Sequence, residues 1–392
     1  MMTENKQVYL DNNATCMVSP GVREAMMPFF GELYGNPSSM HNFGGQVATH
    51  LKEARERVAA LLNASPDEIV FTSCGTEADN HAIRGVLEAS GEKRHIVTTK
   101  VEHPAVLNVF RFLAKKKGYR VTELGVSKQG DLDLDELRAS LTPDTALLSV
   151  MAANNETGTL FPIDEIGAIA REAGVIFHTD AVQAVGKIPL DLKKIPCDLL
   201  SLSGHKLHTP KGIGALYIRK GTRISPFMIG GHQENGRRAG TENVPYIIGL
   251  GKACEEAMND IFEENNRVRK LRDKLEEGLI SAIRHTHING NPRWRLPNTT
   301  NLGFEFIEGE AILLHLSAAG IAASSGSACT SGSLEPSHVL MAMETPFSYA
   351  HGSVRFSLSK FTSEEEIDYT LKVVPPIIQK LREMSPFYDA SK

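Results

Sequence analysis

Short apolar segments alternate with segments of helical periodicity through the first half of the chain, and this alternation limits the fold more than any other feature. The strand candidates are residues 68–72, 95–99, 146–153, 175–180, 198–203 and 213–218. The helical candidates are residues 44–62, 76–90, 104–117 and 163–173. Nearly continuous apolar strands separated by helices are typical of a mostly parallel sheet that is buried on both faces. The sequence therefore predicts an α/β domain.

The pattern changes in the last third of the chain. A charged helix candidate at residues 263–283 precedes a strand region at 296–306, a helix at 308–320 and a last helix that ends before Ser385. A chain of 392 residues exceeds the length at which a single hydrophobic core usually stops growing. We therefore predict a large domain at residues 16–258 and a smaller α+β domain formed by residues 1–15 and 259–392.

The composition argues against several classes of protein. Hydrophobic residues make up 41% of the chain, charged residues make up 23%, and the formal net charge is -5, so nucleic acid is not an expected partner. We find no apolar run near the ~20 residues that a membrane span requires, and the polar N-terminus favours a cytoplasmic protein. The five cysteines include no CxxC pair, which argues against a disulfide framework and a structural zinc site.

Lys206 is the most unusual residue, because it follows a buried strand candidate in the segment SLSGHKLHTPKGIG. Lysine is normally exposed and charged, so a lysine in this place suggests an amine that acts as a nucleophile. Such an amine can form a Schiff base with an aldehyde cofactor such as pyridoxal phosphate. Thr76, His103, Asn155 and Asp180 also lie at or just after strand ends. In a mostly parallel sheet, ligands bind at these carboxyl ends.

A phosphate site is indicated at Gly75 and Thr76, where a strand gives way to a helix whose first N–H groups are free. The alternative is an ordinary helix cap at Thr76. Asp180 is a candidate partner for a pyridinium nitrogen, although a lone aspartate is more often a turn residue or a cap. Gln183 could donate to the phenolic oxygen of the cofactor. His103 could stack on a ring or carry protons, or it could be a buried structural histidine.

Three further residues are candidate phosphate ligands: Ser203, His205 and Thr241. Arg355 is suited to clamp a substrate carboxylate, and the alternative is a structural ion pair. Asn155 could contact either the carboxylate or a cofactor oxygen.

Cys329 lies in a segment rich in serine and glycine, residues 323–338, which is typical of a loop. A cysteine on a loop is accessible and is therefore a candidate nucleophile. The other four cysteines have less informative surroundings. Cys254 lies in a helical run and is expected to be buried and inert.

Motifs along nearly the whole chain resemble those of the cysteine desulfurases of the NifS type. These motifs are YLDNNAT, GNPSS, TSCGTE, EHPAV, ANNETGTLFP, HTDAVQAVGK, SGHKLH, RRAGTEN, SSGSACTSG and VRFSLS, in that order. The resemblance implies a homodimer with the α/β fold of the fold type I pyridoxal phosphate transferases, of which aspartate aminotransferase is the model. It also implies removal of sulfur from L-cysteine, with L-alanine as the other product.

The resemblance implies a role for each candidate residue. Lys206 would carry the cofactor, and the other cofactor contacts would come from Gly75, Thr76, His103, Asn155, Asp180, Gln183, Ser203 and His205, with Thr241 reaching the phosphate of the other subunit. Asn155 and Arg355 would hold the substrate, His103 would transfer protons, and Cys329 would take the sulfur as a persulfide. The sulfur would pass to an iron-sulfur scaffold protein, for nitrogenase maturation or for general cluster assembly. No intrinsic metal is expected, with Cys329 at most a transient iron-sulfur ligand.

Two positions depart from the pattern: Cys16 replaces the common threonine, and Thr209 replaces glycine or alanine. The alternatives are a selenocysteine lyase, an aminotransferase of the same fold, or a non-catalytic sulfur carrier that retained the fold. A metal hydrolase built on His205 and His208 is disfavoured because the sequence offers no third ligand. A dinucleotide site at GIGALY lacks the third glycine at the required spacing.

Overall fold

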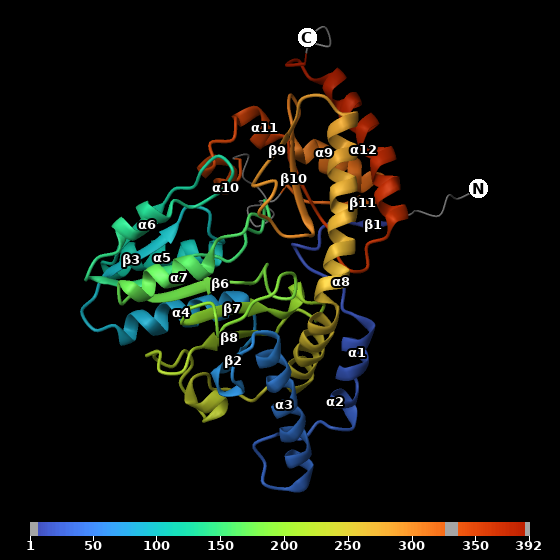
Figure 1. Ribbon diagram of the computed structural model, residues 1–392. Helices are drawn as coiled ribbons and strands as arrows, with labels where there is room; N and C mark the ends of the chain where they lie inside the picture. The colour runs from blue at the N-terminus through green and yellow to red at the C-terminus, as the bar shows by residue number, and fades with distance from the viewer. Residues whose placement is uncertain (1–6, 326–335, 389–392) are drawn as a thin grey trace.

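The computed structural model describes residues 7–325 and 336–388. A large sheet with helices around it occupies one part of the molecule, and a smaller group of strands and helices from the C-terminal third lies beside it (Figure 1). The long helix α8 runs from one part into the other. In the described residues, no helix is both long enough and apolar enough to cross a membrane.

The large sheet has seven strands in the order β2-β8-β7-β6-β5-β3-β4. They are β2 (Ile69–Thr72), β3 (His95–Thr99), β4 (Arg120–Leu124), β5 (Thr145–Ser149), β6 (Ile176–Asp180), β7 (Leu199–Ser203) and β8 (Gly214–Ile218). The run from β7 to β4 is parallel, whereas β8 is antiparallel to both of its neighbours. The predicted mostly parallel sheet is therefore confirmed. The turn between β7 and β8 contains Lys206.

Helices cover both faces of this sheet, which is why its strands are apolar on both sides. On one face, α4 (Gly75–Ala89) and α5 (Pro104–Lys117) form a core with residues such as Ile83, Phe110 and Ile96. On the other face, α3 (Asn42–Leu61), α7 (Ile163–Glu172) and the first part of α8 form a second core. The remaining helices of this part are α1 (Pro20–Met26), α2 (Pro28–Gly31) and α6 (Leu134–Ser140).

The smaller part is built on an antiparallel sheet in the order β12-β10-β9. Its strands are β9 (Thr286–Ile288), β10 (Thr299–Phe304) and β12 (Ser353–Ser357), and its helices are α9 (Gly309–Ala318), α10 (His338–Ala342), α11 (Phe347–His351) and α12 (Glu364–Met384). Near the start of the chain, β1 (Val8–Tyr9) pairs in parallel with β11 (Ile321–Ala322). Val8 and Leu10 therefore belong to the core of the smaller part.

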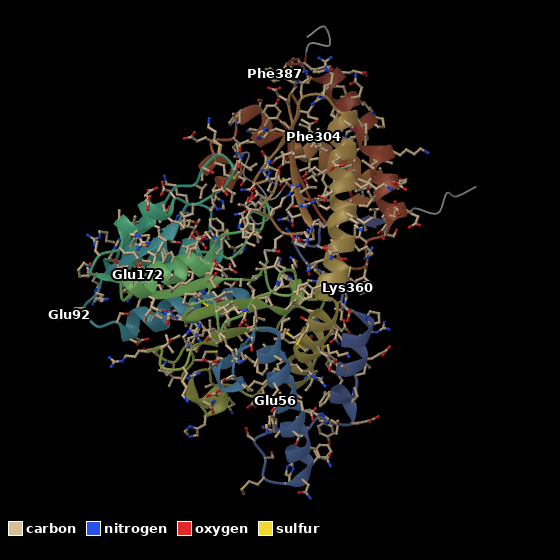
Figure 2. All side chains as sticks on the ribbon, viewed as in Figure 1. Glu56, Glu92, Glu172, Phe304, Lys360 and Phe387 are labelled. Carbon is tan, nitrogen blue, oxygen red and sulfur yellow. The ribbon has the colours of Figure 1, made fainter. Side chains whose placement is uncertain are left out.

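Helix α8 spans Val244–Ala282, or 39 residues, and contributes Leu250 to one core and Leu275 to another. Lys360, labelled beside α8 in Figure 2, binds Glu256 of this helix at 3.0 Å. The prediction of a helix that starts at residue 263 is wrong, because the helical pattern of residues 244–262 continues into it without a break. The predicted domain boundary at residues 258 and 259 falls within this helix and stays a prediction.

The other element predictions are mostly confirmed. Strand β3 and helix α5 have the predicted bounds, whereas β5 ends at Ser149 and not at residue 153. The chain beyond Ser149 still bonds to its neighbour, since the N–H groups of Val150 and Ala152 donate to carbonyls of His178 and Asp180. The structure adds β4 and α6, which the sequence analysis did not predict.

Candidate active site

The predicted site residues meet in a cavity of about 290 Å³ at the carboxyl ends of the parallel strands. The predicted residues that line it are Gly75, Thr76, His103, Asn155, Asp180, Gln183, Ser203, His205, Lys206 and Arg355. They come from segments that are far apart in the sequence. Among the described residues, the fold therefore brings together all the predicted site residues except Thr241.

Lys206 ends a short 3-10 turn, Gly204–Lys206, that directly follows β7. A side chain at Gly204 would lie 2.3 Å from Oγ1 of Thr209 and 2.7 Å from Cγ2 of Ile213, so this tight turn requires glycine. The amine of Lys206 donates to the main-chain oxygens of Asn13 at 2.5 Å and Ala14 at 2.7 Å. The N-terminal segment therefore fixes the position of the lysine nitrogen.

Asp180 and His103 are two of the titratable residues that line this cavity. Asp180 ends β6, and its Oδ1 accepts from the N–H of Val182 at 2.9 Å. Burial raises the pKa of Asp180, and the nearby His103 and Lys206 act against this rise. His103 caps α5, since its Nδ1 accepts from the N–H of Ala105 at 3.1 Å. Burial lowers the pKa of His103, and Lys206 lowers it further while Asp180 raises it.

The first turn of α4 faces the cavity through Gly75 and Thr76. A side chain at Gly75 would lie 2.8 Å from Cγ2 of Val182 and 3.3 Å from Cβ of Ser203, so glycine is needed here. The helix cap is Cys74, whose Sγ accepts from the N–H of Glu77 at 3.4 Å. The alternative of a cap at Thr76 is therefore wrong. Free N–H groups at the start of a helix suit an anion such as phosphate.

His205 and Ser203 complete this side of the cavity. The Nδ1 of His205 lies 3.2 Å from the hydroxyl of Thr15. Burial, followed by the charge of Lys206, lowers the pKa of His205 to about 4, so its imidazole is neutral near pH 7. A neutral imidazole and a serine hydroxyl can each donate a hydrogen bond to a phosphate oxygen.

Arg355 lies on β12 and reaches the cavity from the smaller part. Its Nη2 donates to Oδ1 of Asp11 at 2.8 Å, and its Nη1 donates to the carbonyl of Asn155 at 2.8 Å. The structural ion pair considered from the sequence is therefore present. Among the described residues, the buried Nε of Arg355 has no hydrogen-bond partner.

Asn13 is a hub of the site that was not predicted from the sequence. Its carbonyl accepts from Lys206 and from Nε2 of Gln183, the latter at 3.0 Å, and its side chain donates to Thr299 at 2.9 Å. Asn13 acts through both its main chain and its side chain, which also accepts from Asn298 at 3.1 Å. Its place in the motif YLDNNAT is the one signal that could have indicated it.

Asp79 is a second residue that the sequence analysis missed. It lies one turn into α4, lines the cavity and is buried, with Oδ1 3.6 Å from Nε2 of His178. Burial and the neighbouring Asp180 raise the pKa of Asp79 well above its usual range. A helical spacing of four residues from Gly75 could have placed it on the cavity face.

One described site residue lies outside this cavity. Thr241 is exposed and lines a separate pocket of about 200 Å³ with Ser73 and Arg238. Cys329 lies outside the described residues. Cys254 is buried as expected, and burial raises its pKa to about 12. Cys16 is also buried, with its pKa raised, and its Sγ donates to the carbonyl of Asn12 at 3.3 Å.

Comparison with known proteins places this site in a family. The family model described as aminotransferase class-V matches residues 8–370. By this match, the chain is a member of the class-V aminotransferases, whose enzymes depend on pyridoxal phosphate.

The relatives narrow the assignment. The chain is 61% identical over 380 residues to a cysteine desulfurase of Nostoc sp., covering 97% of this chain and 95% of that protein. It is 58% identical over 385 residues to the cysteine desulfurase NifS of Azotobacter vinelandii, covering 98% of this chain and 96% of that protein. A solved structure of a NifS-like protein superposes with a TM-score of 0.90 at 42% identity, covering 96% of this chain and 100% of that one. The chain belongs to the cysteine desulfurases, which confirms the resemblance and the predicted fold.

Proposed function

We propose that this chain removes sulfur from L-cysteine by means of pyridoxal phosphate attached to Lys206, with Cys329 as the sulfur acceptor. The observation that carries the proposal is the single cavity that brings Lys206 together with Asp180, His103 and the first turn of α4. These residues supply an amine, an acid, an imidazole and an anion site. No other cavity described above combines these four groups.

The residues present fit this cofactor. The phosphate would be held by the N–H groups of the first turn of α4, where Gly75 leaves room, and by Ser203 and His205. Asp180 would hold the ring nitrogen and Gln183 the phenolic oxygen. When it is bound, the cofactor supplies an electron sink that makes the Cα proton of the substrate acidic.

The chain's own residues then position the substrate and move protons. Arg355 offers the unpartnered donor at Nε, and together with Asn155 it would bind the substrate carboxylate. Released from the cofactor, the amine of Lys206 would take the proton from Cα. His103 is suited to give or take protons, because an imidazole can do both and burial lowers the pKa of this one.

The sulfur transfer step assigns Cys329 as the nucleophile. Its thiolate attacks the sulfur of the substrate, the carbon-sulfur bond breaks, and a sulfur-sulfur bond forms. A proton then replaces the sulfur on the substrate carbon, so that alanine and a persulfide on Cys329 are the two products. The sequence context of Cys329 supports this role, and so does the burial of Cys16, Cys197 and Cys254, which keeps those thiols from competing.

Two further parts of the proposal concern partners. Thr241 lines a pocket separate from the cavity that holds Lys206 in the same chain, which supports its predicted role at the site of a second subunit. We therefore propose a homodimer. An iron-sulfur scaffold protein is the proposed acceptor of the sulfur on Cys329.

The product assay tests this function. The purified protein is incubated with L-cysteine, and alanine and protein-bound persulfide are measured together. We expect equal amounts of both in the first turnover, none of either above a trace from Cys329→Ala, and nearly normal turnover from the buried control Cys254→Ala. Full alanine production by Cys329→Ala would contradict the assignment of the acceptor.

A second pair of variants tests the amine. Lys206→Ala should lower alanine formation at least about a thousandfold, because both the cofactor link and the Cα base are lost. Lys211→Ala, an exposed lysine in the same segment, is the matched control and should act like the parent. Alanine formation by Lys206→Ala at the parent rate would overturn the proposed function.

A further inference from the structure

A second lysine, Lys187, lies behind the proposed cofactor site without a role in the mechanism above. It follows a helical turn in which the N–H of Val185 donates to the carbonyl of Ala181 and that of Ile188 to Ala184. This spacing puts Lys187 on the same side of the turn as Gln183, four residues earlier. Gly186 has a φ of +73°, and a side chain there would lie 2.2 Å from Leu207, so glycine is required to bring the lysine inward.

The amine of Lys187 is bound to two amide oxygens of the site. It donates to Oε1 of Gln183 at 2.8 Å and to Oδ1 of Asn13 at 3.4 Å. An ammonium group can only donate, so the oxygen of Gln183 must face Lys187 and the nitrogen must face the other way. That nitrogen donates to the carbonyl of Asn13, which also accepts from Lys206. Lys187 therefore fixes the amide orientation that makes Gln183 a donor.

The charge of Lys187 has no carboxylate partner among residues 7–325 and 336–388. The titratable and charged groups near it, or lining the adjoining cavity of about 70 Å³, are Cys16, His205, Lys206, His208, Asp260, Arg355 and Lys360. Of these, Arg355 is paired with Asp11, and Lys360 with Glu256 and Asp260. A positive charge in this place disfavours a second positive charge on the nitrogen of Lys206.

The pKa values agree with this geometry. The pKa of Lys187 is lowered to about 8, mainly by burial and also by the charges of Lys206 and Arg355, while Cys16 acts against this. Lys187 therefore keeps its proton over most of the neutral range but loses it in mild alkali. Lys187 is the one residue in the segment Gln183–Lys187 whose side chain can carry a positive charge.

We propose that Lys187 is a positioning residue that orients the amide of Gln183 toward the cofactor and keeps the nitrogen of Lys206 from holding a proton. This inference rests on the proposed function, because it requires that Lys206 carries the cofactor. Lys187 is not among the described residues that line the cavity of Lys206. It acts through Gln183, through Asn13 and through its charge.

The test is an absorbance titration of the full-length protein with its bound cofactor. The pH at which the band of the lysine-bound cofactor changes is measured for the parent and for Lys187→Met, which removes both the charge and the hydrogen bonds. We expect this midpoint to rise by about one pH unit in Lys187→Met, since a neighbouring positive charge is lost. Lys187→Arg should restore the midpoint because it keeps a charged donor.

Two controls make the titration decisive. Lys194→Met removes a lysine whose side chain is 85% exposed, and its midpoint should equal that of the parent. If Lys187→Met does not fold, Lys187→Gln, which keeps a donor but not the charge, replaces it with the same expected shift. A midpoint unchanged in the folded variant would overturn the inference.

The outcome also separates this inference from the proposed function. If the parent shows no lysine-bound cofactor band, or if Lys206→Ala shows the same band, the proposed function fails. If the parent shows the band and Lys187→Met titrates like the parent, only the role of Lys187 fails.

Discussion

Burial controls proton binding at several single residues of this chain. The imidazoles of His81, His178 and His205 are removed from water, and this lowers their pKa values to about 4, 3 and 4, respectively. In the cavity, the shift keeps His205 neutral for hydrogen bonding. The same shift makes the stability of the fold depend on pH, because an unfolded chain would bind protons that the folded chain does not.

We predict that His81 makes the fold sensitive to acid. Its pKa is about 4 in the folded chain and 6.5 in the unfolded chain. The stability that this group contributes is therefore present above pH 6.5 and is lost as the pH falls toward 4. Between pH 7 and pH 5 the loss should be about 2 kcal/mol. Denaturant unfolding at both pH values measures this loss in the free energy of unfolding. The loss should be smaller by that amount in His81→Gln than in the parent.

The control for this prediction is His50→Gln, because the side chain of His50 is 42% exposed. This variant should lose as much stability between pH 7 and pH 5 as the parent does. Equal losses for His81→Gln and the parent would show that His81 is not the group that titrates.

At the residue scale, side-chain chemistry was predictable and main-chain chemistry was not. Asp180, His103 and Lys206 could be placed in one cavity because each lies at or just after a strand end. The carbonyl groups of Asn13 and Ala14 are chemically the same as every other carbonyl, so only the folded chain shows that they hold Lys206. The cap of α4 at Cys74 was missed because cysteine is not among the common capping residues.

At the scale of elements, the pair α3 and α8 shows how closely two helices can approach. A side chain at Gly251 of α8 would lie 2.6 Å from the Cα atom of Ala54 on α3. Main-chain atoms cannot move aside as the end of a long side chain can. The small residue at this crossing therefore sets the distance between the two helices.

We predict that Gly251→Ala destabilises the fold by about 1–3 kcal/mol, because overpacking outweighs the better helix propensity of alanine. Gly45→Ala on α3 is the matched control, since a side chain there would meet no atom within 4 Å. The control should be neutral or more stable by up to about 1 kcal/mol. Thermal unfolding of both variants checks the prediction, and an increase in stability for Gly251→Ala would contradict it.

Element predictions succeeded where burial produces a clear pattern. Every residue of β3, β5 and β7 is buried, so the apolar runs mark these strands well. Strand β4 lies at the sheet edge and is partly exposed, so the segment Arg120–Leu124 has no apolar run. The helical pattern alone could not show that residues 244–262 and 263–282 form one helix.

At the scale of the whole molecule, the cavity that contains Lys206 does not include Thr241 of the same chain. Thr241 is exposed and lies with Ser73 and Arg238, in a pocket other than the one that contains Lys206. An interface between two identical subunits can supply it from the partner. Sedimentation velocity should therefore show a dimer.

We predict that two defective chains complement each other in such a dimer. Lys206→Ala and Thr241→Ala chains are unfolded together, refolded and assayed for alanine. Mixed dimers pair the intact Lys206 of one chain with the intact Thr241 of the other, so about a quarter of the parent activity should return. Activity no greater than the mean of the two separate variants, or a fully active monomer, would exclude a shared site.

The contacts of Lys206 also limit how early during translation the site can form. The carbonyl of Asn13 is made early, but its donor Lys206 follows 193 residues later, and Arg355 lies 344 residues beyond its partner Asp11. Contacts over such separations form only after the intervening chain is available to close the loop. A nascent chain that ends before Lys206 should therefore be unable to hold the cofactor, and one that ends before β12 lacks the arginine proposed to bind the substrate carboxylate.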